Sequence, residues 1–148
     1  MNTLRLTIKD SQPLDHAAVE LNTGLHPEIS TLDPPVGESR DPVFYSIFIK
    51  EDYRHIGICC LYNLTNMGVE FGVRIFLPEY WGMGLGPEVV NALCGLAFGA
   101  HPEIPTVFAK TPVYNERAIR CYKKCGFMQY SRAMLSGYDM IYMMKSRR

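Results

Sequence analysis

The stretch from residue 72 to residue 88 limits the possible folds of this chain more than any other, because it has the pattern of a strand, a loop and a helix. An apolar run with β-branched Val73 and Ile75 reaches Pro78, crosses a short polar step and enters glycines at alternate positions before helix-forming sequence resumes. Such glycines let backbone N–H groups approach a ligand, and a helix beginning there adds its unpaired first-turn N–H groups and the positive end of its dipole. The pattern predicts a cradle for a phosphate or pyrophosphate; the alternative is a tight turn without a ligand.

The glycines of this loop, Gly82, Gly84 and Gly86, do not fit two common phosphate-binding motifs. No lysine follows the last glycine, as the loop of nucleoside triphosphatases requires. Pro87 stands where the dinucleotide-binding motif needs its last glycine. Both of these functions are therefore disfavoured.

The composition predicts one domain, residues 1–148, in the cytoplasm. The length of 148 residues is ordinary for a single domain, and Lys plus Arg equal Asp plus Glu at 15 each, which argues against nucleic-acid or membrane partners. The N-terminus lacks the basic and apolar regions of a secretion signal, and no apolar run is long enough to span a bilayer. The five cysteines lack metal-binding spacing, so we expect reduced thiols and no metal.

The remaining sequence predicts further strands and helices around the loop. The order is strand, helix, three antiparallel strands, helix, strand, helix and a closing hairpin. The strand after the long helix should pair in parallel with the strand before the loop, through a right-handed crossover. The proline-rich segment 26–42 is expected to form a shaped loop with one helical turn. The expected strands cover residues 4–8, 43–49, 55–61, 69–77, 106–110, 127–134 and 138–144.

A second informative stretch, residues 114–127, has the signals of a complete helix. Asn115 is a good N-cap, and Gly126 suits the left-handed position after the last turn. Asn115 and Tyr122 share one face of this helix, because they are seven residues apart. The helical spacing predicts that the basic residues of the helix point elsewhere; these are Arg117, Arg120 and Lys124.

Both stretches resemble motifs of the GCN5-related N-acetyltransferase (GNAT) family. The loop is similar to the family's coenzyme A loop, Q/R-x-x-G-x-G/A, but Trp81 stands at the Q/R position and so removes one side-chain donor. The aromatic residue before the first glycine looks especially like the branch that acetylates the N-termini of ribosomal proteins. The helix resembles the family's N-x-x-A-x-x-x-Y-x-x-x-G-F at Asn115, Ala118, Tyr122, Gly126 and Phe127.

The resemblance implies a fold and an activity. The fold is of the α/β class, α+β type: a mixed, mostly antiparallel twisted sheet of six to seven strands, flanked by about four helices, with a parallel splayed strand pair at the cofactor site. The activity is transfer of an acetyl group from acetyl-CoA to a primary amine by direct attack, with another acyl-CoA as a possible donor. The alternative is a catalytically silent CoA-binding sensor or interaction module, which the loss of the Q/R donor favours and the presence of Tyr122 and Glu70 disfavours.

The resemblance also implies roles for individual residues. Tyr122 matches the acid that protonates the leaving thiolate; the alternative is a core tyrosine. Glu70 is our candidate for the base that deprotonates the amine, directly or through a water; the alternative is an ordinary strand carboxylate. Asn115 is expected to bind the cofactor or substrate as well as to cap its helix. Backbone cofactor contacts are assigned to the strand end at Ile75, Phe76 and Leu77 and to the cradle at Trp81, Gly82, Met83, Gly84, Leu85 and Gly86.

The acceptor is open among a protein N-terminus, a polyamine and a small amine. Residues 28–41 are acidic and lie where the family builds its acceptor wall, which favours a cationic amine; the alternative is a solvated loop. A homodimer is a further prediction, if the C-terminal hairpin exposes an apolar edge through Met134, Met140, Met143 and Met144.

Overall fold

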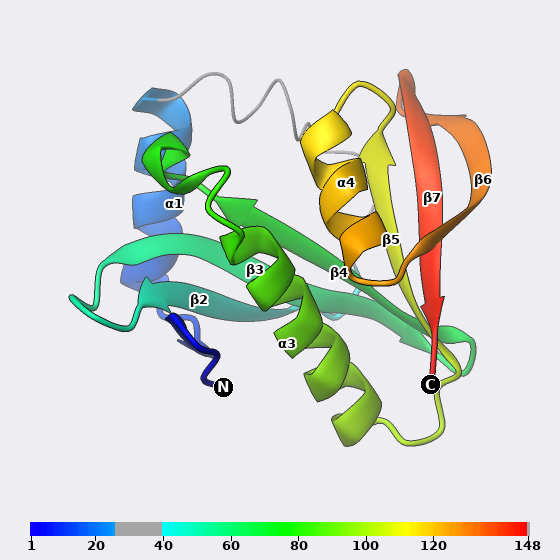
Figure 1. Ribbon diagram of the computed structural model, residues 1–148, viewed down its shortest axis with the longest axis horizontal. Helices are drawn as coiled ribbons and strands as arrows, with labels where there is room; N and C mark the ends of the chain where they lie inside the picture. The colour runs from blue at the N-terminus through cyan, green and yellow to red at the C-terminus, as the bar shows by residue number, and fades with distance from the viewer. Residues whose placement is uncertain (26–39, 148) are drawn as a thin grey trace.

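The computed structural model describes residues 1–25 and 40–147. A seven-stranded sheet has the order β1-β2-β3-β4-β5-β7-β6, and three α-helices pack on it within the described residues (Figure 1). The strands are β1 (Leu6–Asp10), β2 (Val43–Ile49), β3 (His55–Thr65), β4 (Gly68–Ile75), β5 (Thr106–Pro112), β6 (Met128–Leu135) and β7 (Tyr138–Ser146). The helices are α1 (Pro13–Leu25), α3 (Leu85–Ala100) and α4 (Glu116–Lys124), with a 3-10 turn η1 (Pro78–Tyr80).

The pairing of β4 with β5 determines where the sheet opens. These two strands are parallel, as predicted, whereas the other neighbours in the sheet are antiparallel. They pair only at Val69 with Val107 and at Glu70 with Phe108, although both strands continue further. Beyond Glu70 the strands therefore separate, and the mixed sheet with one splayed parallel pair is confirmed.

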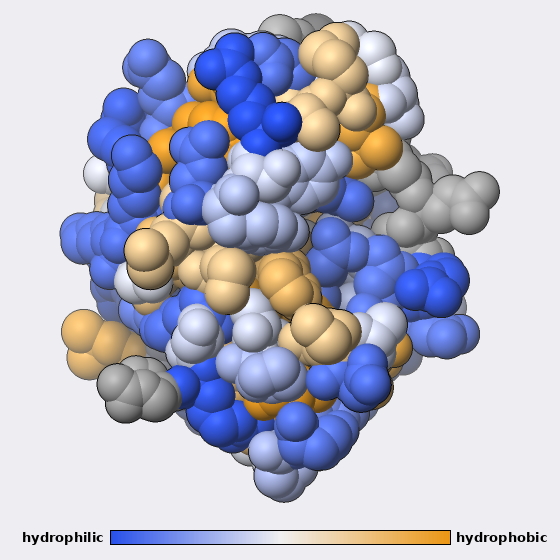
Figure 2. Space-filling view, turned by 90° about the vertical axis from the view of Figure 1, so that its right-hand side faces the viewer, coloured by the Kyte–Doolittle hydropathy of each residue, from blue (hydrophilic) through white to orange (hydrophobic). Residues whose placement is uncertain are grey.

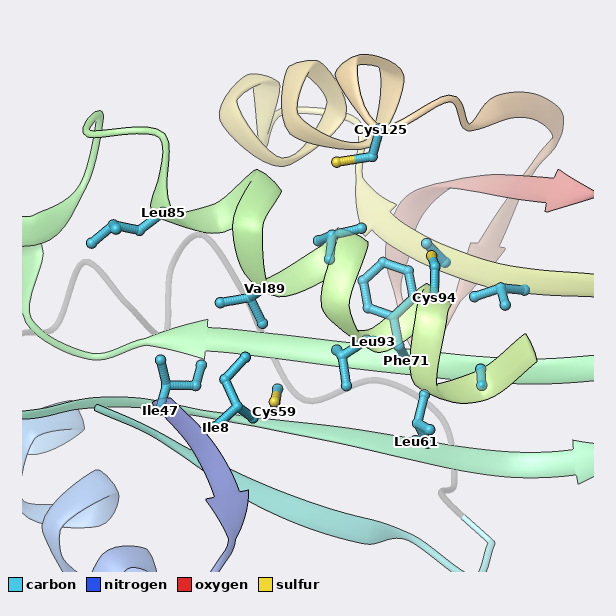
Figure 3. Packing of buried hydrophobic residues seen from close by; sticks show 14 of the residues in the cluster. Ile8, Ile47, Cys59, Leu61, Phe71, Leu85, Val89, Leu93, Cys94 and Cys125 are labelled. Atoms are coloured by element: carbon cyan, nitrogen blue, oxygen red, sulfur yellow. The ribbon is translucent and has the colours of Figure 1, made fainter. Parts of the chain in front are cut away.

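The two faces of the sheet carry different helices. Neighbouring side chains of a strand point to opposite faces. The Ser46 hydroxyl donates to the Asp15 carboxylate of α1 at 2.8 Å, whereas Ile47 joins the apolar cluster beneath α3 (Figure 3). From α3, Val89 and Leu93 point toward that cluster and are fully buried (Figure 3). The sheet thus has α1 on one face and α3 on the other.

The helix boundaries follow the predicted signals. Gly84, with a φ of 78°, leads into α3, and Pro87 lies in its first turn, where its missing N–H costs nothing. The Asn115 side chain caps α4 by accepting from the Ala118 N–H at 3.2 Å. Gly126 follows α4 with a φ of 93°, the left-handed conformation expected there.

Some expectations are corrected by the structure. Strand β1 begins at Leu6 and not at residue 4, because a turn that joins Thr3 N–H to the Leu6 carbonyl precedes it. Met140 and Met143 are buried in the sheet, so they are not part of an exposed edge. The helical turn expected near residue 30 lies outside the described residues. In the part of the chain that the structure describes, no helix has the length and apolarity needed to cross a membrane.

The edge strand β6 keeps apolar side chains at the surface. Met128 and Met134 are 71% and 66% exposed, and β6 is the last strand of the sheet. Figure 2 looks onto the side of the molecule where β6 and β7 lie and shows apolar side chains interspersed with hydrophilic ones. The predicted homodimer stays a prediction.

Candidate active site

The gap between β4 and β5 continues into a cleft of about 500 Å³. Its walls come from the end of β4, the glycine loop, the start of α3, the second half of β5 and helix α4. Both motifs identified in the sequence therefore meet in one place. The cleft is lined by eight of the predicted site residues: Ile75, Trp81, Gly82, Gly84, Leu85, Gly86, Asn115 and Tyr122.

The glycine loop has the geometry of an anion cradle. Gly82 and Gly84 have φ angles of 74° and 78°, which are costly for other residues, and both are exposed. Among the residues that the structure describes, no atom outside the neighbouring residues lies within 4 Å of a Cβ placed on Gly82, so the backbone there is open to a ligand. The N-terminus of α3 follows directly and contributes unpaired N–H groups and its dipole. The residues present therefore fit the phosphates of a nucleotide-type ligand.

Trp81 fastens this loop to the strand that precedes it. Its Nε1–H donates to the Ile75 carbonyl at 2.8 Å. On the ring face, the Arg117 guanidinium of α4 lies 3.8 Å from the ring centroid. The indole therefore connects the end of β4, the cradle and helix α4.

The charge of the cleft is basic. Its lining includes Arg74, Lys110, Arg117, Arg120 and Lys124, and none of the described residues that line it is acidic. This positive lining favours an anionic ligand. The expectation that the basic residues of α4 point away from the site is wrong, because the cleft extends along the helix and long side chains reach its wall. The motif spacing predicted which face of the helix carries Tyr122. It did not indicate that the basic side chains of α4 extend to the cleft.

Tyr122 lies on the α3 face of the sheet, at the wall of the cleft. Its ring is half-buried and meets the Phe71 ring edge-on, with centroids 5.3 Å apart. A phenol held by a buried aromatic neighbour has a defined position, and its hydroxyl is suited to donate a proton. Its catalytic role stays a prediction.

Glu70 occupies the opposite face of β4 from Phe71 and is not in the cleft wall. Its carboxylate accepts a short hydrogen bond from the Asn63 amide and lies 3.8 Å from the Lys110 ammonium. Lys110 does line the cleft, so it stands between Glu70 and the open gap. No motif or spacing in the sequence singled out Lys110, and the role of Glu70 as a base stays a prediction.

The strand end that was expected to offer free backbone groups is partly engaged. The Phe76 N–H donates to the Ile56 carbonyl of β3 at 2.9 Å, so the expectation that it is free is corrected. The Ile75 carbonyl accepts from Trp81. Phe76 and Leu77 have buried side chains, and neither of them nor Met83 is part of the cleft lining. Of the three strand-end residues predicted to bind the cofactor, Ile75 alone lines the cleft.

An anchor from the N-terminal segment holds the start of α3. The Arg5 side chain donates to the Met83 carbonyl at 2.8 Å and forms an ion pair with Glu88. The Thr3 hydroxyl donates to the same carboxylate at 2.8 Å. Burial by itself raises the pKa of Glu88, but the hydrogen bonds from Thr3 and Arg5 outweigh it and lower this pKa. The anchor joins segments far apart in sequence, and no local pattern predicted it.

Sequence comparison matches residues 30–128 to the acetyltransferase (GNAT) domain family. The chain belongs to the GNAT family. A segment of 66 residues is 36% identical to the kanamycin resistance protein of Rhizobium radiobacter and covers 45% of this chain and 60% of that protein. A segment of 66 residues is also 36% identical to aminoglycoside N(6′)-acetyltransferase type 1 of Klebsiella pneumoniae and covers 32% of that protein. The match thus spans less than two thirds of either relative.

Solved structures share the fold of this GNAT protein at low sequence identity. The spermidine N-acetyltransferase of Vibrio cholerae, solved with CoA and spermine, has a TM-score of 0.78 at 18% identity. The match covers 97% of this chain and 96% of the Vibrio chain. The aminoglycoside acetyltransferase AAC(6′)-Ib, solved with coenzyme A and kanamycin, has a TM-score of 0.77 at 21% identity, with coverages of 96% and 95%. These likenesses support the fold class.

Proposed function

We propose that this protein is an N-acetyltransferase that transfers an acetyl group from acetyl-CoA to a primary amine by direct attack. The observation that carries this proposal is the cleft itself. It opens where β4 and β5 separate and contains the glycine cradle, a basic lining and the Tyr122 phenol. The glycine cradle and the basic lining would bind an extended anionic ligand, and the phenol would donate a proton to a leaving group.

The residues of the cleft divide between holding the donor and supporting the reaction. The N–H groups around Gly82 and Gly84 and the N-terminus of α3 would hold the pyrophosphate, while Ile75 and Asn115 would face the pantetheine arm. Bound acetyl-CoA supplies the acyl thioester. Tyr122 would give its proton to the departing sulfur.

The acceptor amine has to be neutral to attack, and we propose Glu70 as the group that receives its proton. Lys110 stands between Glu70 and the cleft, so a water or a shift of Lys110 would have to connect them. A lysine-like amine has a pKa of about 10.4 and an α-amine about 7.7 to 8.0, so both are largely protonated near pH 7.

For the acceptor we propose a small polycationic amine. Relatives of this chain are named for aminoglycosides and a solved neighbour for spermidine, which supports amines with several charges. The loop sequence, with its similarity to the ribosomal-protein branch, supports a protein N-terminus as the second acceptor to test. The acidic segment expected to face the acceptor lies largely outside the described residues.

Calorimetry with CoA tests the donor site. We expect micromolar binding by the wild-type chain and its loss in Gly84→Asp, because that change adds bulk and negative charge at a left-handed position of the cradle. Gly95→Asp is the matched control, since Gly95 is exposed on α3 and a Cβ placed there would meet no other part of the described chain within 4 Å. Absence of CoA binding by folded wild-type protein would refute the proposed function.

Turnover is tested by thiol release from acetyl-CoA with kanamycin, spermidine or an N-terminal peptide as acceptor. Release that depends on one of these amines would support the enzyme and identify the acceptor class. CoA binding without turnover on any amine would instead support the alternative, a CoA-binding sensor, for which the replacement of the Q/R donor by Trp81 is the specific observation.

A further inference from the structure

Trp81 and Arg117 form a stacked pair at the wall of the cleft. The guanidinium carbon of Arg117 lies 3.8 Å from the Trp81 ring centroid, and both residues line the cleft. The indole cannot rotate freely, because its Nε1–H is bonded to the Ile75 carbonyl. A guanidinium stacked on a fixed ring keeps its N–H donors pointing outward in its own plane. The geometry therefore presents a planar fork of donors beside the glycine cradle.

Two of the four other cations in the cleft lining have a carboxylate partner. Lys110 lies 3.8 Å from the Glu70 carboxylate, and Arg120 lies 3.9 Å from Glu116. For Arg117, the described residues provide no hydrogen bond and no ion pair, so its donors are not used by the protein there. Contact with the ring reduces its hydration, and this burial together with the nearby Arg120 lowers its pKa.

We propose that Arg117, held by its stack on Trp81, binds a phosphate of CoA and supplies the side-chain donor that the loop lacks at position 81. The inference rests on the proposed function. The resemblance of the loop leaves an aromatic residue where a Gln or Arg donor is expected, and the structure brings a guanidinium from α4 to that residue. A guanidinium can donate to two oxygens of a phosphate at once. Arg117 can therefore bind the phosphate in place of the Gln or Arg side chain that is expected at position 81.

The first test measures CoA affinity by calorimetry and by the fluorescence of Trp81, the one tryptophan of the chain. Arg117→Gln should raise the Kd for CoA about 10- to 100-fold, the range for loss of a hydrogen bond to a charged group. The Kd of Arg117→Lys for CoA should lie between those of the wild type and Arg117→Gln, since lysine keeps the charge without the planar fork. The control is Lys123→Gln, which removes one charge from α4 outside the cleft lining and should change the Kd by less than about twofold.

A double-mutant cycle tests whether Trp81 acts through Arg117. Trp81→Ala should weaken CoA binding in the wild type but much less in the Arg117→Gln background. The affinities in this cycle are measured by calorimetry, because the fluorescent residue is lost. Additive effects would overturn the positioning role of Trp81, and equal CoA affinity of wild type and Arg117→Gln would overturn the proposal. A larger loss of CoA affinity in Arg120→Gln than in Arg117→Gln would also overturn the proposal, because it would assign the phosphate to Arg120.

Analogues of CoA identify which phosphate is bound. The Arg117→Gln defect should persist with dephospho-CoA if the pyrophosphate is the partner and disappear if the 3′-phosphate is. An equal defect with pantetheine, which has no phosphate, would overturn the proposal. Circular dichroism and the Tm of each variant confirm folding. Failure of the wild type to bind CoA refutes the proposed function, whereas wild-type binding that does not depend on Arg117 refutes this inference alone.

Discussion

Arg5 and Glu88 are 83 residues apart in sequence, yet the Arg5 backbone N–H donates to the Glu88 carboxylate at 3.0 Å and their side chains form an ion pair. The same arginine donates to the Met83 carbonyl in the cradle. The segment before β1 therefore fixes the start of α3 and the cradle together. It also neutralises the Glu88 carboxylate in the first turn of α3.

Arg5→Gln should destabilise the protein and weaken CoA binding. The variant leaves Glu88 partly buried with fewer partners, and we expect a loss of about 1–2 kcal/mol in the free energy of unfolding. The uncompensated carboxylate should also repel the phosphates and raise the Kd for CoA severalfold. Urea denaturation and calorimetry measure the two effects.

The control for this variant is Arg132→Gln. Arg132 pairs with Asp139 on the exposed β6–β7 hairpin, far from the cradle in the sheet order. Exposed pairs contribute little, so both quantities should stay at their wild-type values. An unchanged stability and affinity in Arg5→Gln would show that the anchor has no energetic role.

Stability should fall at acid pH, in part through Glu88. Its pKa is lowered in the folded state from an ordinary value of 4.5, so the folded protein binds that proton less readily than the unfolded chain. The stabilisation is fully present above about pH 5.5 and is lost as the pH falls below 4.5 through the lowered value. Glu88→Gln should therefore lose stability near pH 7 but show a smaller decrease between pH 6 and pH 3. Urea midpoints across this range measure the difference, and parallel curves would contradict it.

Local signals predicted most of the elements, and tertiary contacts account for what they missed. Caps and glycines located α3 and α4 because their effects act within one turn, as Asn115 and Gly84 illustrate. Arg5 was missed because its partner is 83 residues away, and Lys110 because its place in the cleft depends on where β4 and β5 separate. The motif located Tyr122, but only the sheet geometry could put Glu70 on the other face.

Gly68→Ala should be strongly destabilising, because Gly68 lies at the start of β4 beside β5. A Cβ there would overlap the Thr106 carbonyl oxygen, and the φ of Gly68, 152°, is unfavourable for other residues. We expect a loss of about 2 kcal/mol or more in the free energy of unfolding. Gly95→Ala on the exposed side of α3 is the control and should stabilise by about 0.5–1 kcal/mol. Similar urea midpoints for the two variants would show that β4 can move away from β5 at little cost.

Tyr122→Phe should remove turnover and keep CoA binding. The phenylalanine ring preserves the edge-on contact with Phe71, so the fold and the Kd for CoA should be unchanged. Loss of the proton donor should lower kcat about 10²- to 10⁴-fold. Tyr138→Phe, in the β6–β7 hairpin, is the matched control. A fully active Tyr122→Phe enzyme would assign Tyr122 to packing alone.

Glu70→Gln should produce a defect that depends on pH. If Glu70 takes the proton of the acceptor amine, its loss matters most where that amine is protonated and matters little once the amine is neutral in solution. For a lysine-like amine with a pKa of about 10.4, the ratio of wild-type to variant kcat/KM should be large at pH 7 and shrink toward pH 10.

The control for this last variant is Glu103→Gln, which removes an exposed carboxylate from the loop between α3 and β5. It should match the wild type at every pH. A Glu70→Gln defect of constant size across the pH range would indicate a structural role through Lys110 and Asn63, because losing those contacts affects the site whether or not the amine is charged. No defect at any pH would make Glu70 an ordinary strand carboxylate and leave water as the acceptor of the proton.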